Sequence, residues 1–162
     1  MVDVQTVSIA IASAGAVAGI VYYAFQVRHQ TKLRESEVIL KLSSMFSEER
    51  FMKAYERVFD CEFEDYNDFL RKHGSLFYDK SEPELKDSLV QVLNQIETLG
   101  LLLKRKVVDA DLMYEIYPGI RLWEKLKPLV EGARKELNSP GLWSCFEYYY
   151  NEMKKREQRG VK

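Results

Sequence analysis

Alternating apolar and polar residues, the signal of a half-buried β-strand, occur nowhere in this sequence. An internal repeat and a low-complexity tract are also absent. The apolar residues recur instead at steps of three and four, which is the spacing of one helix face. The sequence therefore predicts an all-α fold.

Residues suited to metal binding or nucleophilic catalysis are scarce. The two cysteines, Cys61 and Cys145, match no metal-ligand or redox spacing. The two histidines, His29 and His73, have no partner at the spacing of a zinc site. We therefore expect two free thiols, no metal and no cofactor, and the sequence identifies no catalytic residue.

An excess of positive charge is missing as well. The chain has 24 Lys and Arg against 25 Asp and Glu, which gives a formal net charge of -1. Since nucleic-acid binding needs a basic surface, no nucleic acid is expected as a partner. The length of 162 residues fits one compact domain with a short extension.

Charged side chains are absent between Asp3 and Arg28. As a helix this stretch is about 36 Å long, more than the roughly 30 Å of a bilayer core. The sequence predicts a single membrane-spanning helix over Val4 to Val27. A cleaved signal peptide, a buried core helix and an amphipathic surface helix are the alternatives.

Three basic residues, Arg28, Lys32 and Arg34, follow the uncharged stretch. Basic flanks stay in the cytoplasm, so we expect a single-pass protein of the cell membrane with its N-terminus outside and its body cytoplasmic. The same three side chains could lie against anionic lipid.

Two glycines in the uncharged stretch, Gly15 and Gly19, are four residues apart. This small-xxx-small spacing lets two helix backbones approach closely. It predicts pairing with a second copy or with another membrane protein. The other interpretation is that small residues are simply common in an Ala-rich helix.

The remainder of the chain predicts a bundle of about five or six helices. Its strongest apolar stripe runs from Leu85 to Leu103, and Asp109 is expected to cap the short helix that follows. Pro128 is expected to kink or shorten its own helix. The predicted organisation is an anchor with its basic flank over residues 1–31, a cytoplasmic helical domain over 32–158, and a frayed tail over 159–162.

Several dispersed residues of this body match the pattern of a known family: Asn94 to Leu102, Val108 and Asp109, Trp123 to Pro128, Arg134, and Phe146 with Glu147. On these residues the chain resembles the family catalogued as domain of unknown function 4760. The resemblance implies a small helical protein of bacteria or archaea, often with one or two N-terminal membrane helices. It implies no reaction.

Glu97 lies beside the strongest apolar stripe, where an unpaired carboxylate is costly. One interpretation makes it an acid or base in a pocket. The interpretation that we favour places it in a structural polar network with Arg134 and Glu147, in which Arg134 or Arg121 neutralises it and fixes helix register.

Four carboxylates, those of Asp60, Glu62, Glu64 and Asp65, form an acidic cluster that could hold a hard cation. The cluster lacks the glycine and the alternating ligands of a calcium loop. A solvated acidic face is therefore the favoured interpretation.

Tyr148 and Tyr149 belong to a run of three tyrosines that covers most of a helix circumference, so they are the expected partner surface. These features favour a membrane-tethered helical interaction or scaffold module without catalytic activity. The alternatives are a membrane-bound enzyme, such as a hydrolase, that uses Glu97 or the acidic cluster, and a subunit or effector of a larger membrane complex.

Overall fold

The computed structural model describes residues 3–117 and 119–160, apart from the side chains of residues 4–12, 14, 31–32 and 34–35. These residues form α-helices and no strand, so the prediction of an all-α fold is confirmed. The helices are α1 (Val4–Ser47), α2 (Glu49–Asp60), α3 (Tyr66–His73), α4 (Pro83–Lys104), α5 (Ala110–Ile116), α6 (Ile120–Glu136) and α7 (Ser144–Gly160).

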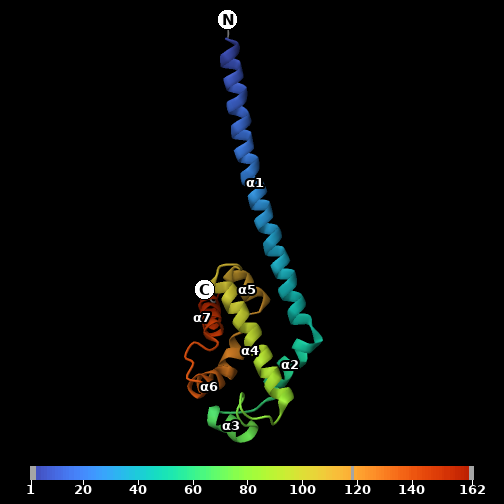
Figure 1. The fold of residues 1–162 in the computed structure, drawn as a ribbon, viewed down its shortest axis with the longest axis vertical. Coiled ribbons are helices and arrows are strands. Elements are labelled where there is room, and N and C mark those ends of the chain that lie inside the picture. The colour runs from blue at the N-terminus through green and yellow to red at the C-terminus, as the bar shows by residue number, and fades with distance from the viewer. Residues whose placement is uncertain (1–2, 118, 161–162) are drawn as a thin grey trace. The chain divides into compact units, whose positions relative to one another are not determined.

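The chain divides into two compact units, one that ends at Leu42 and one that begins at Ser43. The first unit holds most of α1, whose residues from Gly15 to Gln30 are all exposed. The second unit holds the last turn of α1 and the helices α2 to α7 (Figure 1). The division predicted from the sequence, after residues 31 and 158, stays a prediction.

The predicted membrane-spanning helix over Val4 to Val27 is wrong, because no helix among the described residues is both long enough and apolar enough to cross a bilayer. A span needs about 20 consecutive apolar residues. Between Ser13 and Val27, the described side chains of α1 include glycine, tyrosine and glutamine among the apolar ones. The other residues of the predicted span, 4–12 and 14, lie outside the described side chains. The predicted single-pass topology, which needs that span, is therefore wrong as well. The location at the cell membrane stays a prediction.

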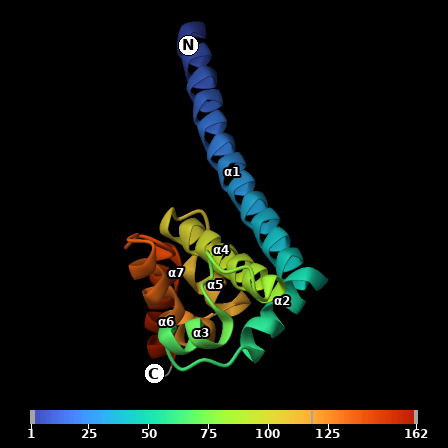
Figure 2. The same ribbon diagram turned by 60° about the horizontal axis from the view of Figure 1, so that its bottom comes forward.

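Helix α4 lies at the centre of the second unit, between α2 and α7 (Figures 1 and 2). Pro83 occupies its first turn, where the missing N–H loses no helix hydrogen bond. Its apolar stripe is the core of the unit. The stripe residues without exposed surface are Leu89, Val92, Leu93, Ile96 and Leu99.

The remaining helices pack around this centre, α3 on α6, and both α5 and α6 on α7. Trp123 of α6 meets Phe146 of α7 edge to face, with 4.9 Å between the ring centroids. Pro128 lies inside α6 and does not end it, because the helix continues to Glu136. One turn later, Gly132 leaves room for the Tyr66 ring of α3, which an added Cβ would overlap.

An aromatic cluster joins the last turn of α1 to α2 and to the end of α5. Phe46 stacks on Tyr117 at 4.9 Å between centroids and meets Phe51 edge to face at 5.4 Å. Tyr55 lies 4.7 Å from Phe59 and 5.9 Å from Phe51. Such pairs contribute about 0.5–1.5 kcal/mol each beyond the burial of their surface, so this cluster fixes the start of the second unit.

The substitution Phe51→Ala is expected to lower the free energy of unfolding by about 3–5 kcal/mol, because the ring is 2% exposed and its removal leaves a cavity. The matched control is Met52→Ala on the same turn. Met52 is 45% exposed, so the expected loss is below about 0.5 kcal/mol. Urea denaturation followed by circular dichroism measures both, and equal losses would contradict the assignment of the buried face of α2.

Candidate functional site

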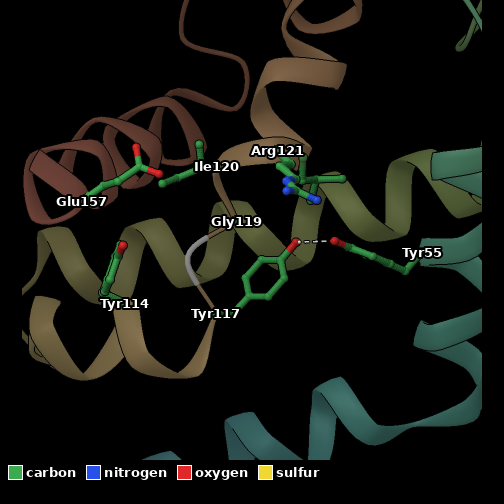
Figure 3. Close-up of a pocket in the computed structure, with 8 residues that line it drawn as sticks. Tyr55, Tyr114, Tyr117, Gly119, Ile120, Arg121 and Glu157 are labelled. Carbon is green, nitrogen blue, oxygen red and sulfur yellow. Dashed lines mark hydrogen bonds between the residues drawn. The ribbon is translucent and has the colours of Figure 1, made fainter. Parts of the chain in front are cut away.

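A hollow with a volume of about 240 Å³ lies between α2, the end of α5, the start of α6 and the end of α7 (Figure 3). Tyrosine rings and aliphatic side chains form most of its lining. The lining residues that matter most for its chemistry are Tyr55, Tyr117, Ile120, Arg121 and Glu157. An apolar hollow with a few convergent polar groups is the usual form of a small-molecule site.

Tyr117 is fixed from three sides. Its hydroxyl donates to the Tyr55 hydroxyl, with 3.2 Å between the oxygens (Figure 3). Its carbonyl oxygen accepts a hydrogen bond from the Tyr149 hydroxyl, and its ring stacks on Phe46. Burial raises the pKa of Tyr117, so the phenol stays protonated at any physiological pH. The part of the wall that Tyr117 forms is therefore fixed in position and uncharged.

Gly119 permits the close approach of two of these rings. Its φ of +61° is in the left-handed region, which favours glycine. An added Cβ would lie 2.9 Å from a Tyr117 ring carbon and 3.1 Å from a Tyr149 ring carbon. Glycine at this position thus lets the start of α6 lie directly against both tyrosines.

The two charged residues of the lining differ in their partners. Glu157 accepts a hydrogen bond from Lys154 at 3.1 Å. Arg121 has no hydrogen-bond or ion-pair partner within the described ranges 3–117 and 119–160. It also stands in the first turn of α6, which contains no acidic residue. A cation at a helix N-terminus lowers the stability of the fold by about 0.3–1 kcal/mol. Neither an ion pair among the described residues nor the helix dipole therefore compensates the positive charge of Arg121.

A thiol, an imidazole and a carboxylate form a second polar group. The Cys61 sulfur lies 3.6 Å from Nε2 of His73, and Nδ1 of His73 lies 2.9 Å from Oε2 of Glu82. The spacing of the two cysteines and two histidines in the sequence gave no sign of this arrangement. It joins the end of α2, the last turn of α3 and the residue before α4.

This order of groups is that of a cysteine nucleophile, its base and an orienting acid. However, the Cys61 side chain is only 6% exposed. Burial raises the pKa of the Cys61 thiol, an effect that the Lys125 cation opposes. A thiol that is protonated and enclosed acts as a hydrogen-bond donor, so we assign these contacts a structural role.

Glu97 is paired with neither Arg121 nor Arg134. Its two carboxylate oxygens accept from the backbone N–H groups of Cys145 at 3.1 Å and Phe146 at 2.7 Å. These amides belong to the first turn of α7, where helix geometry supplies no partner. Glu97 of α4 therefore caps α7 from outside that helix, and the helix dipole favours its charge. A carboxylate with both oxygens engaged is poorly placed to act as an acid or base.

The structure does bring Arg134 and Glu147 together, at 2.8 Å between Nη1 and Oε2. Nε of Arg134 also donates to the carbonyl of Leu142 at 2.8 Å. Close by, Asn94 accepts a hydrogen bond from the Trp143 indole at 3.0 Å. These bonds hold the turn before α7 against α4 and α6.

At Gly100, one turn after Glu97, the backbones of α4 and α7 approach closely. A Cβ added there would overlap the carbonyl group of Cys145. One interface therefore explains the spacing of these three residues. Asn94 accepts from the Trp143 indole, Glu97 caps two amides of α7, and Gly100 leaves room for the Cys145 carbonyl.

The acidic cluster is spread along a turn and a helix start. Asp65 caps α3 by accepting from the Asp68 backbone N–H at 2.8 Å. Asp68, which is buried, pairs with Lys72 at 2.9 Å and also with Arg71. Among the residues that the structure describes, no three His, Cys, Asp or Glu side chains are grouped so that they could hold a metal ion.

The two tyrosines predicted as a partner surface differ in position. Tyr149 has no exposed surface and belongs to the core, so it offers nothing to a partner. Tyr148 is half-buried. The run of three tyrosines wraps around α7, and tertiary packing rather than the local sequence determines which ring is enclosed.

The remaining predicted residues lie on α1. A Cβ added at Gly15 or Gly19 would meet nothing within 4 Å, so this face has no partner among the described residues. Arg28 is exposed. The side chains of Lys32 and Arg34 lie outside the described part.

Comparison with known proteins gives one match. The sequence model of the family described as Domain of unknown function (DUF4760) matches residues 9–153. No curated protein and no solved structure matches the chain. The matched range includes Asn94, Glu97 and Gly100, whose interface is described above.

The substitution Glu97→Ala is expected to lower the free energy of unfolding by about 2–4 kcal/mol, because two amides at the start of α7 lose their acceptor. Glu97→Gln keeps one acceptor oxygen and should lose less, about 1–2 kcal/mol. Thr98→Ala, an exposed neighbour on α4, is the control and should change stability by less than about 0.5 kcal/mol. Chemical denaturation measures all three, and a Glu97→Ala variant as stable as the control would contradict the capping role.

Asp68 is expected to make stability depend on pH. Hydrogen bonds from Lys72 and from the Glu64 backbone N–H hold the pKa of its carboxyl below the usual value of 3.8. A lowered folded-state pKa means that the stabilisation is complete above the unfolded pKa and is lost as pH falls through the folded pKa. Asp68→Asn should therefore be less stable than the natural protein at pH 6, and the difference should shrink below about pH 3.8. Thermal unfolding from pH 2.5 to 7 tests this, with Asp60→Asn as the exposed control. A difference that stays constant over this range would contradict it.

Proposed function

Because the chain belongs to the family described as Domain of unknown function (DUF4760), whose name carries no activity, we propose its role from its own surface: it is an interaction module that associates with a second copy through α1. The observation that carries the proposal is the exposed apolar surface of α1. The helical body from Ser43 onward is the part that such pairing would bring together in two copies.

The described part of α1 exposes large apolar side chains around its whole circumference. Their exposed fractions run from 43% for Val27 to 70% for Ile20. Large contiguous patches of exposed apolar surface mark interaction sites. The residues concerned are Val17, Ile20, Val21, Tyr22, Tyr23, Phe25 and Val27.

The glycine face supplies the argument for a second copy of the chain as the partner. Gly15 and Gly19 lie one turn apart on one side of α1, and nothing occupies the space beside either of them. Small residues on a helix allow another backbone to approach closely. A two-fold symmetric pair uses the same face on both subunits, so one such face per chain is sufficient.

A catalytic role has less support. Glu97, the carboxylate considered as an acid or base, has both oxygens bound by amides of α7. The Cys61 thiol is enclosed and its pKa is raised by burial. An association role requires neither group to react, so it agrees with what both residues do in the fold.

The double substitution Gly15→Leu and Gly19→Leu tests the proposal. Within one chain, the added side chains have open space, so the body should remain folded. Between two chains they would hold the backbones apart, and the dimer should weaken at least tenfold. Light scattering with size-exclusion chromatography and sedimentation equilibrium of the full chain, each with and without mild detergent, measure the mass and the dissociation constant.

Ala24→Leu is the matched control, because it enlarges a small residue on the opposite side of α1, about 140° to 180° around the helix from the two glycines. The control variant should associate like the natural chain. A natural chain that is monomeric at all concentrations would contradict the proposal, as would a glycine double variant that dimerises as well as the Ala24 variant.

A further inference from the structure

We propose that the tyrosine-lined hollow beside Gly119 binds a small organic monocarboxylate, whose carboxylate is held by Arg121 and the Tyr55 hydroxyl and whose apolar body lies along Tyr117 and Ile120. The site lies wholly within the second unit, from Ser43 onward, and does not depend on α1 pairing. Figure 3 shows Arg121 above the two hydroxyls, at the opposite end of the hollow from Glu157.

The guanidinium of Arg121 is the first reason to expect an anion. It has no acidic partner in the described part of the chain, and it stands at the N-terminal end of α6, where the helix dipole disfavours a cation. A carboxylate bound there would neutralise the guanidinium and interact favourably with the helix dipole. Arginine also presents paired N–H donors that match the two oxygens of a carboxylate.

The second reason is the hydrogen bond between the two tyrosine hydroxyls. This bond uses one of their two protons, so when Tyr117 donates, the proton of Tyr55 is left for another acceptor. Tyr117 is itself fixed, its carbonyl by Tyr149 and its ring by Phe46. Because Tyr55 is hydrogen-bonded to this fixed residue, its hydroxyl is held in place before a ligand arrives, which lowers the entropic cost of binding.

The size and lining of the hollow indicate the rest of the ligand. A volume of about 240 Å³ admits roughly eight to ten non-hydrogen atoms, which is a carboxylate on a ring or a short branched chain. Ile120 is almost completely buried beneath the hollow and Gly119 adds no side chain, so the floor is apolar. A free inorganic anion would leave this surface unused.

Glu157 limits the charge of the ligand. Its carboxylate lines the same hollow away from Arg121 and is bound to Lys154. A second negative group on the ligand would face this carboxylate in a confined space, where like charges repel. The site should therefore prefer a monocarboxylate to a dicarboxylate of similar shape.

Isothermal titration and two-dimensional NMR of the full chain test the proposal with four probes: benzoate, 4-methylpentanoate, benzamide and terephthalate. At least one of the two monocarboxylates should bind, and that one should bind at least tenfold more tightly than benzamide, which is neutral, and terephthalate, which carries two charges. The amide signals of Gly119 and Ile120 should shift. No binding by either monocarboxylate would overturn the proposal, as would equal binding of benzamide.

Variants locate the binding. Arg121→Gln should weaken binding of the better monocarboxylate at least tenfold, because it removes the positive charge and the paired guanidinium donors. Tyr55→Phe should weaken it at least threefold, because it removes the hydroxyl donor. Arg105→Gln is the matched control, an exposed arginine just after α4 and outside the lining of the hollow. Arg121 is exposed, so its variant should keep the melting temperature of the natural chain. Binding that survives in folded Arg121→Gln, or that is lost equally in Arg105→Gln, would overturn the assignment.

Discussion

The close approach of α4 and α7 is the constraint on which the second unit depends. Gly100 lets the backbone at Cys145 lie against α4, and the Glu97 carboxylate then receives two amides of α7 that no helix bond could satisfy. Either feature alone would be unfavourable: a side chain at position 100 would exclude the carbonyl, and a Glu97 without the amides would be a poorly paired carboxylate beside the core. Together they determine where α7 begins and which of its faces turns inward.

The position of α7 in turn fixes the wall of the hollow. With α7 held, Tyr149 has no exposed surface and its hydroxyl reaches the Tyr117 carbonyl. Tyr117 then meets Phe46 on one side and Tyr55 on the other. Side chains of α1, α2, the end of α5 and α7 are therefore linked through one tyrosine. A change at the α4–α7 interface, far along the sequence from Tyr55, should alter the hollow, because rigid aromatic contacts transmit displacement.

Features that depend on neighbouring residues could be predicted from the sequence, and features that depend on distant ones could not. The apolar stripe of α4 and the cap of α5 by Asp109 follow from local spacing. The partner of Glu97 was predicted to be an arginine, because a side-chain charge is visible in a sequence, whereas an unsatisfied amide at the start of a helix 48 residues away is not. The contact of Cys61 with His73 was missed for the same reason, since it arises where three helix ends meet. Pro128 was expected to kink or shorten α6, but the helix continues past it to Glu136, so losing the hydrogen bond that proline removes does not end the helix.

The helical conformation of α1 and its proposed association with a second copy should form one coupled equilibrium. Helices gain most of their stability from tertiary packing rather than from intrinsic propensity. The stretch from Gly15 to Gln30 is exposed throughout, and its glycines and β-branched residues are weaker helix formers than alanine. Each apolar side chain that becomes fully buried contributes about 1.5–3 kcal/mol, so a partner that covers even three of them would exceed the propensity cost of this stretch. If two copies pair through α1 as proposed, association stabilises the helix, and the helix in turn aligns Gly15 and Gly19 on one face. A substitution that weakens the pairing should also reduce the helix content of α1 while the body from Ser43 onward stays folded.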